Sequence, residues 1–523
     1  TAPANFGSKA SSGNGIETFV NYKWGHYEPV TDKPVPVLPN KRVRAPRNTN
    51  FMDIGSVHSA TDDVDDGDPD DVEPAAAAES DQEATPESYN DAARDERWVQ
   101  SMKDEVAALR NRGVWRVVPT PQGVRLIKSK YVYRVKKDWT GKVVKRKSRL
   151  VIQGFSQREG IDYDETFAPV AKVTTFRLML ALSKVLNLEI HQLDVDSAFL
   201  YADLEEDVYM KPPPGMDLKS GYCLKLLKSL YGLKQAPRNW NKNIVDHIKS
   251  IGFAQSVLDN CLFVKTVGEE TYLISLYVDD ILIAGSDPSK IAEIKSEFTS
   301  RYEMKDLGEL NYYLGMKVTR TADYIQLDQT RYTMDILAKY DHLLQEYKNK
   351  NYATPMEQDL KLRKSEADSL TDQQKDYVER FPYQNIVGAL LYLSINTRPD
   401  ISYSVGVLAR FSKNPNYRAC KALLRVLVYL RGTSEKGIRY TGTDLCVYAY
   451  SDADWAGDLD SRKSTTGYVV YAAGGPIAWQ SKLQTTIAVS TMEAEYMAAF
   501  GAIQELIWTK GVLGEIGFDY VGP

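Results

Sequence analysis

The sequence predicts an α+β protein of more than one domain. Its 523 residues, 43% of them hydrophobic, are enough for two to four domains, each with a sizeable core. The stretch "LISLYVDDILIAG" (273–285) has two apolar arms joined by a very short turn, and strands connected so tightly must be antiparallel. Other segments carry the apolar spacing of amphipathic helices. Strands of this kind mixed with helices favour the α+β class.

Composition predicts the cellular location of the protein and the state of its cysteines. No apolar run approaches the roughly 20 residues that cross a bilayer, and the N-terminus lacks the layout of a secretory signal, so we expect an intracellular protein without a membrane partner. The four cysteines are far apart and form no CxxC pair. We therefore expect reduced thiols rather than a disulfide framework or a zinc site.

The net charge of −5 is the sum of a strongly acidic segment and an otherwise basic chain. Residues 62–96 contain fifteen Asp or Glu and one basic residue, Arg94, a local balance of −14 that leaves +9 for the rest. Residues 125–149 contain eleven Lys or Arg and one acid, Asp138. This pattern favours a protein that binds a polyanion, although a solvated hairpin face is the plainer explanation of the basic stretch taken alone.

The first half of the chain divides into recognisable elements. Residues 1–90 combine a Pro-rich stretch with the acidic run, so we expect a disordered linker or tail. "RWVQSMKDEVAALRNRG" (97–113) predicts a helix, and the alternating segments on either side of 139–141 predict a hairpin of basic strands. "VTTFRLMLALSKVLN" (173–187) predicts a second helix, followed by the strand "LEIHQLDV" (188–195).

The second half begins with the apolar hairpin at 273–285, whose turn lies at or beside the two aspartates. "YQNIVGALLYLS" (383–394) and "CKALLRVLVYLRGT" (420–433) predict amphipathic helices. "LCVYAYSDADWAG" (445–457), "GYVVYAAGGPIAWQSK" (467–482) and "TTIAVS" (485–490) predict a meander of strands that ends in one long helix.

The aspartates at strand ends are the strongest indication of chemistry. Asp279 and Asp280 interrupt the hairpin, and Asp194 ends the strand at 188–195. Aspartates in a turn usually satisfy backbone groups, which is the structural explanation. If the strands are neighbours in one sheet, however, three carboxylates converge and repel one another unless cations neutralise them. Mg²⁺ suits such a site, and two ions about 4 Å apart would support phosphoryl transfer. These patterns alone do not separate a polymerase from a nuclease.

An ordered set of motifs resembles the copia-type LTR retrotransposon Pol polyproteins, in the part that carries the reverse transcriptase. The set runs from about 98 to 510 and comprises "RLVIQGFSQREGIDYDETFAPVAK" (149–172), "QLDVDSAFL" (192–200), "LEEDVYMKPPPG" (204–215), "KSLYGLKQAPRNW" (228–240), "YVDD" (277–280), "MKDLGELNYYLGMKV" (304–318), "NTRPDISYSV" (396–405), "YSDADWAG" (450–457) and "STMEAEYMAA" (490–499). A lone YVDD would be weak evidence, but the ordered set is specific.

The resemblance implies a right-hand polymerase with fingers, palm and thumb over 91–345, the end of the thumb and a connection over 346–441, and a partial RNase H-like domain over 442–523. Residues 1–90 would be a spacer that follows integrase. The implied activity is RNA-directed DNA synthesis with two Mg²⁺ ions. The implied partners are an RNA or DNA template-primer, dNTPs, and other parts of the polyprotein such as integrase and capsid. The implied location is a cytoplasmic virus-like particle and, with the integration complex, the nucleus.

The resemblance also implies roles for individual residues. Asp194, Asp279 and Asp280 match the metal-binding triad, and Phe199 matches the aromatic gate against a ribose 2′-hydroxyl, with an ordinary core phenylalanine as its structural alternative. The residues that match positions contacting the nucleotide or template are Arg149, Lys136, Gly232, Lys234 and Gln235. "NYYLGMKV", around Leu314 and Gly315, resembles the hairpin that grips the primer end.

A second active site is incomplete in the sequence. Asp452 matches the first carboxylate of an RNase H site, and Glu493 and Glu495 compete for the second. Ser490 and Glu493 fit a capping box, and two residues on a helix differ by about 200°, so Glu493 is expected to cap the helix and Glu495 to match the catalytic glutamate. The later aspartate of the family is missing before Pro523, and Asp519 lies too early to replace it. We therefore expect little or no RNA cleavage.

The leading hypothesis is thus an RNA-directed DNA polymerase. Its main rival is a catalytically silent relic or subunit that keeps the same fold and binds nucleic acid without turnover. A metal-dependent integrase or nuclease is less consistent with paired aspartates on a hairpin.

Overall fold

The computed structural model describes residues 85–518 except 138–142, 359 and 365–369. The expected linker over 1–90 therefore lies almost wholly outside the described residues. Its last two residues belong to a short helix, α1 (Tyr89–Ala92). In the described part of the chain, no helix is both long and apolar enough to cross a membrane.

The first long helix and the basic hairpin form as predicted. Helix α2 (Glu96–Asn111) starts at Asp95, whose side chain accepts a hydrogen bond from the Arg97 amide. Strands β2 (Ser129–Lys137) and β3 (Val143–Ile152) pair antiparallel, and the turn between them lies outside the described residues. A separate three-stranded sheet, in the order β1-β6-β5, consists of β1 (Trp115–Pro119), β5 (Tyr209–Met210) and β6 (Tyr222–Leu226).

The central element is a six-stranded sheet in the order β11-β4-β10-β9-β8-β7. All its pairs are antiparallel, and short connections join β7, β8, β9 and β10 in turn. The strands are β4 (Glu189–Val195), β7 (Ala254–Gln255), β8 (Leu262–Val267), β9 (Glu270–Tyr277), β10 (Asp280–Gly285) and β11 (Met304–Glu309).

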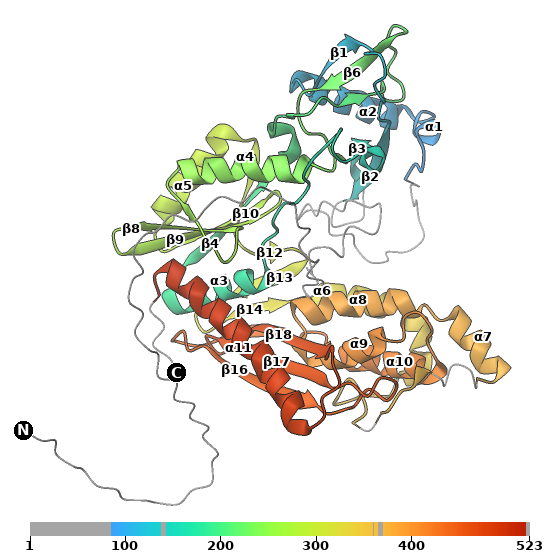
Figure 1. Ribbon diagram of the computed structural model, residues 1–523, viewed down its shortest axis with the longest axis vertical. Coiled ribbons are helices and arrows are strands. Elements are labelled where there is room, and N and C mark those ends of the chain that lie inside the picture. The colour runs from blue at the N-terminus through green and yellow to red at the C-terminus, as the bar shows by residue number, and fades with distance from the viewer. Residues whose placement is uncertain (1–84, 138–142, 359, 365–369, 519–523) are drawn as a thin grey trace, which may run out of the picture. The chain divides into compact units, whose positions relative to one another are not determined.

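Both faces of this sheet are buried. Ile281 and Ile283 belong to one core cluster with helices α4 (Ala236–Ser250) and α5 (Pro288–Arg301), whereas Leu282 belongs to a second cluster with α3 (Val173–Leu186). Figure 1 shows these helices on opposite sides of the strands. Residues of β10 are buried from end to end, which explains why the sequence there is continuously apolar rather than alternating.

A four-stranded sheet and a helical cluster follow. The sheet, in the order β12-β13-β14-β15, contains β12 (Tyr312–Tyr313), β13 (Met316–Arg320), β14 (Ile325–Asp328) and β15 (Ile438–Tyr440). The helices have a core cluster of their own and are α6 (Thr330–Lys339), α7 (Asp372–Arg380), α8 (Tyr383–Asn396), α9 (Ser402–Ala409) and α10 (Tyr417–Arg431). Helices α8 and α10 confirm the two amphipathic patterns predicted there.

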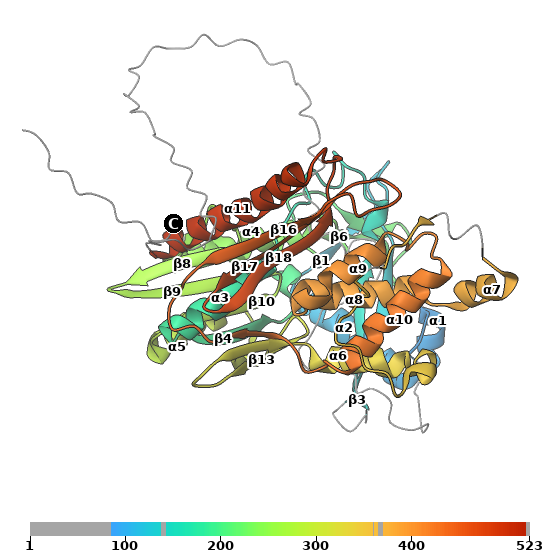
Figure 2. The same ribbon diagram turned by 90° about the horizontal axis from the view of Figure 1, so that it is seen from below.

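The C-terminal part contains three strands and one long helix. Strands β16 (Tyr448–Asp454), β17 (Thr465–Ala472) and β18 (Gly475–Leu483) form an antiparallel sheet in sequence order, and α11 (Thr491–Ile516) packs on it (Figure 2). The strand predicted at 485–490 was wrong. Those residues are an irregular approach to α11, because Ser490 accepts a hydrogen bond from the Glu493 amide and serves as the N-cap.

One buried arginine ties α3 to the C-terminal half. Arg177 is 4% exposed and lies 3.9 Å above the ring of Trp479 on β18. Its guanidinium donates to the carbonyls of Asn396 (2.8 Å) and Ile477 (3.2 Å), and also to that of Ile395. Burial lowers the pKa of Arg177 to about 10, so it remains a cation whose charge is satisfied by carbonyl dipoles at the end of α8.

Candidate catalytic site

The aspartate hairpin turns in two residues. Tyr277 pairs with Asp280, which leaves Val278 and Asp279 as the turn between β9 and β10. Val278 has φ = 54°, the left-handed region that a β-branched residue rarely adopts. A positive φ at the first turn position alone is the type II′ pattern, which normally places glycine there. The indole of Trp240 donates a 2.6 Å hydrogen bond to the Val278 carbonyl and so supports this strained turn.

Asp194 lies directly opposite Asp280. The antiparallel register of β4 and β10 pairs these two residues, and the Val195 amide donates to the Asp279 carbonyl at 3.1 Å. Side chains of directly opposed residues share one face of a sheet, with Cα atoms about 4.5–5.5 Å apart. The strand pairing therefore places Asp194 beside Asp279 and Asp280, which follow it by 85 and 86 positions in the sequence.

Neighbouring polar side chains hold two of these carboxylates. Gln192 donates to Asp280 Oδ1 at 3.0 Å from the next position on the same face of β4. The Lys305 ammonium on β11 lies 3.8 Å from Asp194 Oδ2. Burial raises the pKa of Tyr277, and Asp280 raises it further, so this phenol stays protonated beside the acids.

Carboxylate oxygens are the hard donors that Mg²⁺ prefers, and the three aspartates supply such a donor set. Within the described residues, however, no three or more His, Cys, Asp or Glu side chains gather into an ion-binding cluster. Asp280 is directed to Gln192, and Asp194 to Lys305. The carboxylate donors and their backbone positions thus fit a divalent cation. For the carboxylates to coordinate one ion together, the side chains of Asp280 and Asp194 would have to rotate away from Gln192 and Lys305.

A second group of predicted residues forms a stack. The Arg149 guanidinium on β3 lies 4.3 Å above the ring of Tyr231, and Tyr231 meets Phe199 edge to face with centroids 4.9 Å apart. Phe199 is 9% exposed and follows Ser197, whose left-handed backbone (φ = 58°) starts the 3-10 turn after β4. Tyr231 thus joins the cation and the predicted gate, a role that sequence reasoning missed.

The loop before α4 is locked by an amide network. Gln235 is 1% exposed and donates to the Asp162 carbonyl at 2.9 Å, while Gln157 donates to Gln235 Oε1 at 3.0 Å and accepts from the Lys234 amide at 2.9 Å. The Lys234 ammonium instead reaches Tyr163, at 3.0 Å from its hydroxyl. The network fixes this loop against the segment after β3.

Gly232 permits the close approach of that loop to β3. It has φ = 91°, and a Cβ there would lie 2.2 Å from the Ile152 carbonyl oxygen. The Ile152 amide donates to the Tyr231 carbonyl at 2.8 Å, so the two backbones are bonded directly. Lys136 lies on β2 opposite Lys145, and its side chain falls outside what the structure describes.

The predicted hairpin around Leu314 and Gly315 is present. Tyr313 pairs with Met316, and both turn residues have positive φ, 47° and 70°, as a type I′ turn requires. Tyr392 on α8 donates to the Leu314 carbonyl at 2.7 Å and so fixes the turn.

Comparison with known proteins decides the family. The family model described as reverse transcriptase (RNA-dependent DNA polymerase) matches residues 112–358. The Pol polyprotein from transposon TNT 1-94 of Nicotiana tabacum is 42% identical over 425 residues, which are 80% of this chain and 32% of that protein. The transposon Ty5-1 protein YCL074W of Saccharomyces cerevisiae is 35% identical over 318 residues, 60% of this chain and 100% of that protein. The chain belongs to the reverse transcriptases of copia-type retrotransposon Pol polyproteins.

This reverse transcriptase region spans about a third of the length of the TNT 1-94 polyprotein. Among solved structures, a foamy viral protease-reverse transcriptase in complex with dsDNA is similar at 15% identity and a TM-score of 0.41, covering 78% of this chain and 71% of that one.

The structure places the two residues predicted to be RNase H-like, Asp452 and Glu495, on separate elements. Tyr468 contacts α11, where a Cβ on Gly501 would lie 3.3 Å from its ring, and it pairs with Ser451. Side chains alternate along a strand, so Asp452 points to the sheet face opposite α11, which carries Glu495. Both acids are exposed.

Glu493 caps α11 as predicted. Its carboxylate accepts a 2.7 Å hydrogen bond from the Val489 amide, while its own amide donates to Ser490 Oγ. The side chain reaches one residue further back than a capping box requires. The predicted division of roles between Glu493 and Glu495 is consistent with this contact, because Glu493 is engaged at the helix end.

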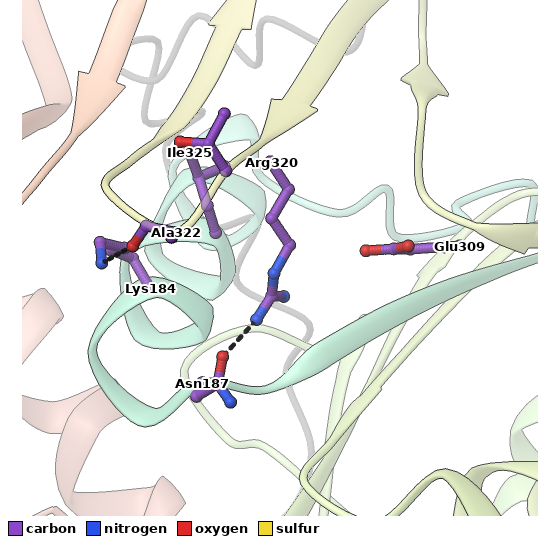
Figure 3. A pocket seen from close by; sticks show the side chains of 7 residues that line it. Lys184, Asn187, Glu309, Arg320, Ala322 and Ile325 are labelled. Atoms are coloured by element: carbon purple, nitrogen blue, oxygen red, sulfur yellow. Dashed lines mark hydrogen bonds between the residues drawn. The ribbon is translucent and has the colours of Figure 1, made fainter.

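One pocket, with a volume of about 340 Å³, lies at the C-terminal end of α3 (Figure 3). There Arg320 donates to Asn187 Oδ1 at 2.8 Å and to Ser183 Oγ at 3.0 Å, and Lys184 donates to the Ala322 carbonyl at 3.0 Å. These cations are used to stabilise the end of a helix. The pocket is therefore a structural feature, separate from the aspartates.

Proposed function

We propose that this chain is an RNA-directed DNA polymerase that adds dNTPs to a primer 3′-hydroxyl at Asp194, Asp279 and Asp280. The observation that carries the proposal is the direct cross-strand placement of Asp280 and Asp194, with Asp279 in the adjoining turn, in a chain of the reverse transcriptase family. The six-stranded sheet would be the palm, and the basic β2–β3 hairpin would belong to the fingers. We assign fingers, palm and thumb to 91–345, the connection to 346–441 and the RNase H-like region to 442–523.

In this proposal, Asp194, Asp279 and Asp280 would hold two Mg²⁺ ions, which would lower the pKa of the primer hydroxyl and stabilise the charge that develops on the phosphates. Other residues of the chain bind and position the nucleotide and the template. Arg149 and Lys136 bind the triphosphate, and the amide-locked loop with Lys234 and Gln235 positions template and nucleotide. Phe199, held edge-on by Tyr231, excludes a ribose 2′-hydroxyl and so selects deoxynucleotides.

The test is incorporation of dTTP on poly(rA)/oligo(dT) with Mg²⁺. We expect the unmodified chain to extend the primer and Asp279→Asn to lose activity by at least about a hundredfold, because electrostatic stabilisation by a site of this kind contributes on that scale. Asp323→Asn, an exposed aspartate between β13 and β14, is the matched control and should extend normally. Tight template binding without extension by the unmodified chain would identify a silent binding protein instead. Equal extension by both the unmodified chain and Asp279→Asn would refute the site.

We further propose that the chain alone cleaves little or no RNA. The support is the separation of Asp452 from the α11 face that carries Glu495. The measurement is release of fragments from a labelled RNA in an RNA/DNA hybrid. Clear cleavage that Asp452→Asn abolishes would overturn the proposal.

A further inference from the structure

Lys305 is a cation that contacts one of the proposed catalytic carboxylates, that of Asp194. It lies on β11, the edge strand of the central sheet, directly opposite Asp194 on β4. Its ammonium is 3.8 Å from Asp194 Oδ2 and 4.0 Å from Asp196 Oδ1. The Lys305 side chain is 42% exposed, whereas that of Asp194 is 14% exposed. A flexible cation thus faces a largely buried acid.

We propose that Lys305 is a built-in competitor of the divalent cation at Asp194. The inference rests on the proposed function of the aspartates. In it, Lys305 determines the Mg²⁺ concentration at which the aspartates bind the ion. An ammonium within 4 Å neutralises part of the charge that attracts an ion, and it repels a divalent cation placed on the same oxygen. Mg²⁺ binds oxygen at about 2.0–2.1 Å in a strict octahedral geometry. Mg²⁺ and the Lys305 ammonium therefore compete for the same Asp194 oxygen.

The side chain of Lys305 can yield its place. Its four-carbon stem is flexible, its ammonium is a compact point charge, and almost half of the side chain already faces solvent. Gln192 at Asp280 is different in kind, because a neutral amide adds no net charge against an arriving ion. Removing the charge of Lys305 should therefore change ion affinity more than removing the neutral amide of Gln192.

The experiment measures ion binding without primer or dNTP. Mg²⁺ binding is followed by calorimetry and Mn²⁺ binding by electron paramagnetic resonance, on the full 523-residue chain. We expect Lys305→Gln to bind either ion about tenfold more tightly than the unmodified chain, because a unit charge about 4 Å away is removed. Lys305→Arg keeps the charge and should bind no more tightly than the unmodified chain.

Two controls make the result specific. Lys348→Gln removes an exposed positive charge that lies between the central strands and α7 in the sequence, and it should bind ions like the unmodified chain. Asp194→Asn in the Lys305→Gln background should abolish the gain, since the competition is for that carboxylate. Thermal unfolding of each variant verifies that the strands remain folded.

Equal or weaker ion binding by folded Lys305→Gln would overturn the inference, even if the unmodified chain extends primers. Failure of the unmodified chain to extend any primer would refute the proposed function instead, and the binding comparison would still report on Lys305. In an active chain, the Mg²⁺ concentration for half-maximal extension should also fall about tenfold in Lys305→Gln, in proportion to the affinity.

Discussion

Trp240→Phe should weaken catalysis through the aspartate turn, without any contact between the indole and the reacting groups. The 2.6 Å hydrogen bond from Trp240 is made to the carbonyl of Val278, the residue in the left-handed region. This hydrogen bond is part-buried, and removing its donor costs about 1 kcal/mol. A residue held in a sparsely populated backbone region stores about 1–3 kcal/mol of strain. The free energy lost with the hydrogen bond is thus similar in size to the backbone strain at Val278 that the bond offsets.

The turn in Trp240→Phe should therefore populate other conformations, and only the native one places Asp279 beside Asp194. A shift of about 1 kcal/mol changes such a population by a factor of about 5. We expect the rate of primer extension per folded molecule to fall by this factor, with the maximal rate more affected than the dNTP concentration for half-maximal rate.

Trp479→Phe is the matched control. Its indole also donates to a backbone carbonyl, that of Ser394, at 2.8 Å, but it lies on the C-terminal sheet. Both variants should lower the thermal midpoint of unfolding, and only Trp240→Phe should lower the extension rate of the folded chain. Equal extension rates for the two variants would refute the argument that the indole positions the turn.

Three other perturbations follow from the structure. Gly232→Ala should destabilise the chain far more than Gly268→Ala, because only the former places a Cβ within 2.2 Å of the Ile152 oxygen, while both have positive φ; thermal midpoints compare them. Burial, aided by the nearby arginine charge, lowers the pKa of His247, so its contribution to stability is fully present above the unfolded pKa of about 6.5 and is lost as pH falls toward the folded value. His247→Phe should show a shallower loss of thermal midpoint between pH 8 and pH 5.5 than the unmodified chain, and identical slopes would contradict this. Arg177→Lys replaces the planar guanidinium with a compact ammonium that cannot span the separate carbonyls of Asn396 and Ile477, so it should lose about 1.5–3 kcal/mol per missing charge-assisted bond in urea unfolding.

Local elements could be read from the sequence because their signals are local. The hairpin of β9 and β10 has two apolar arms and a short turn, and the cap of α11 has Ser490 and Glu493 at the right spacing. The strand expected at 485–490 was wrong for a related reason. Its apolar residues suggest a strand, but Ser490 ends the segment by accepting the Glu493 amide, and the residues before it lead into the helix.

Pairing between distant strands could not be read from pattern. The opposition of Asp194 and Asp280 depends on β4 lying between β10 and β11, and apolar periodicity does not state which strands are neighbours. The family resemblance supplied that expectation. Tyr231, Trp240 and Lys305 were missed as site residues because each acts through a partner far along the chain, although all three lie within motifs that carried the resemblance.

The placement of the aspartates follows from the burial of the sheet. Ile281 and Leu282, the two residues after Asp280, enter different core clusters, so the start of β10 is clamped from both faces. A strand held in this way cannot slip by one residue without moving every apolar side chain to the wrong face. The register that brings Asp280 opposite Asp194 is therefore fixed by hydrophobic packing, which tolerates the repulsion between acids at the end of the strand. Lys305 and Gln192 offset that repulsion within the protein, so under the proposed function an ion would have to displace their contacts to bind the aspartates.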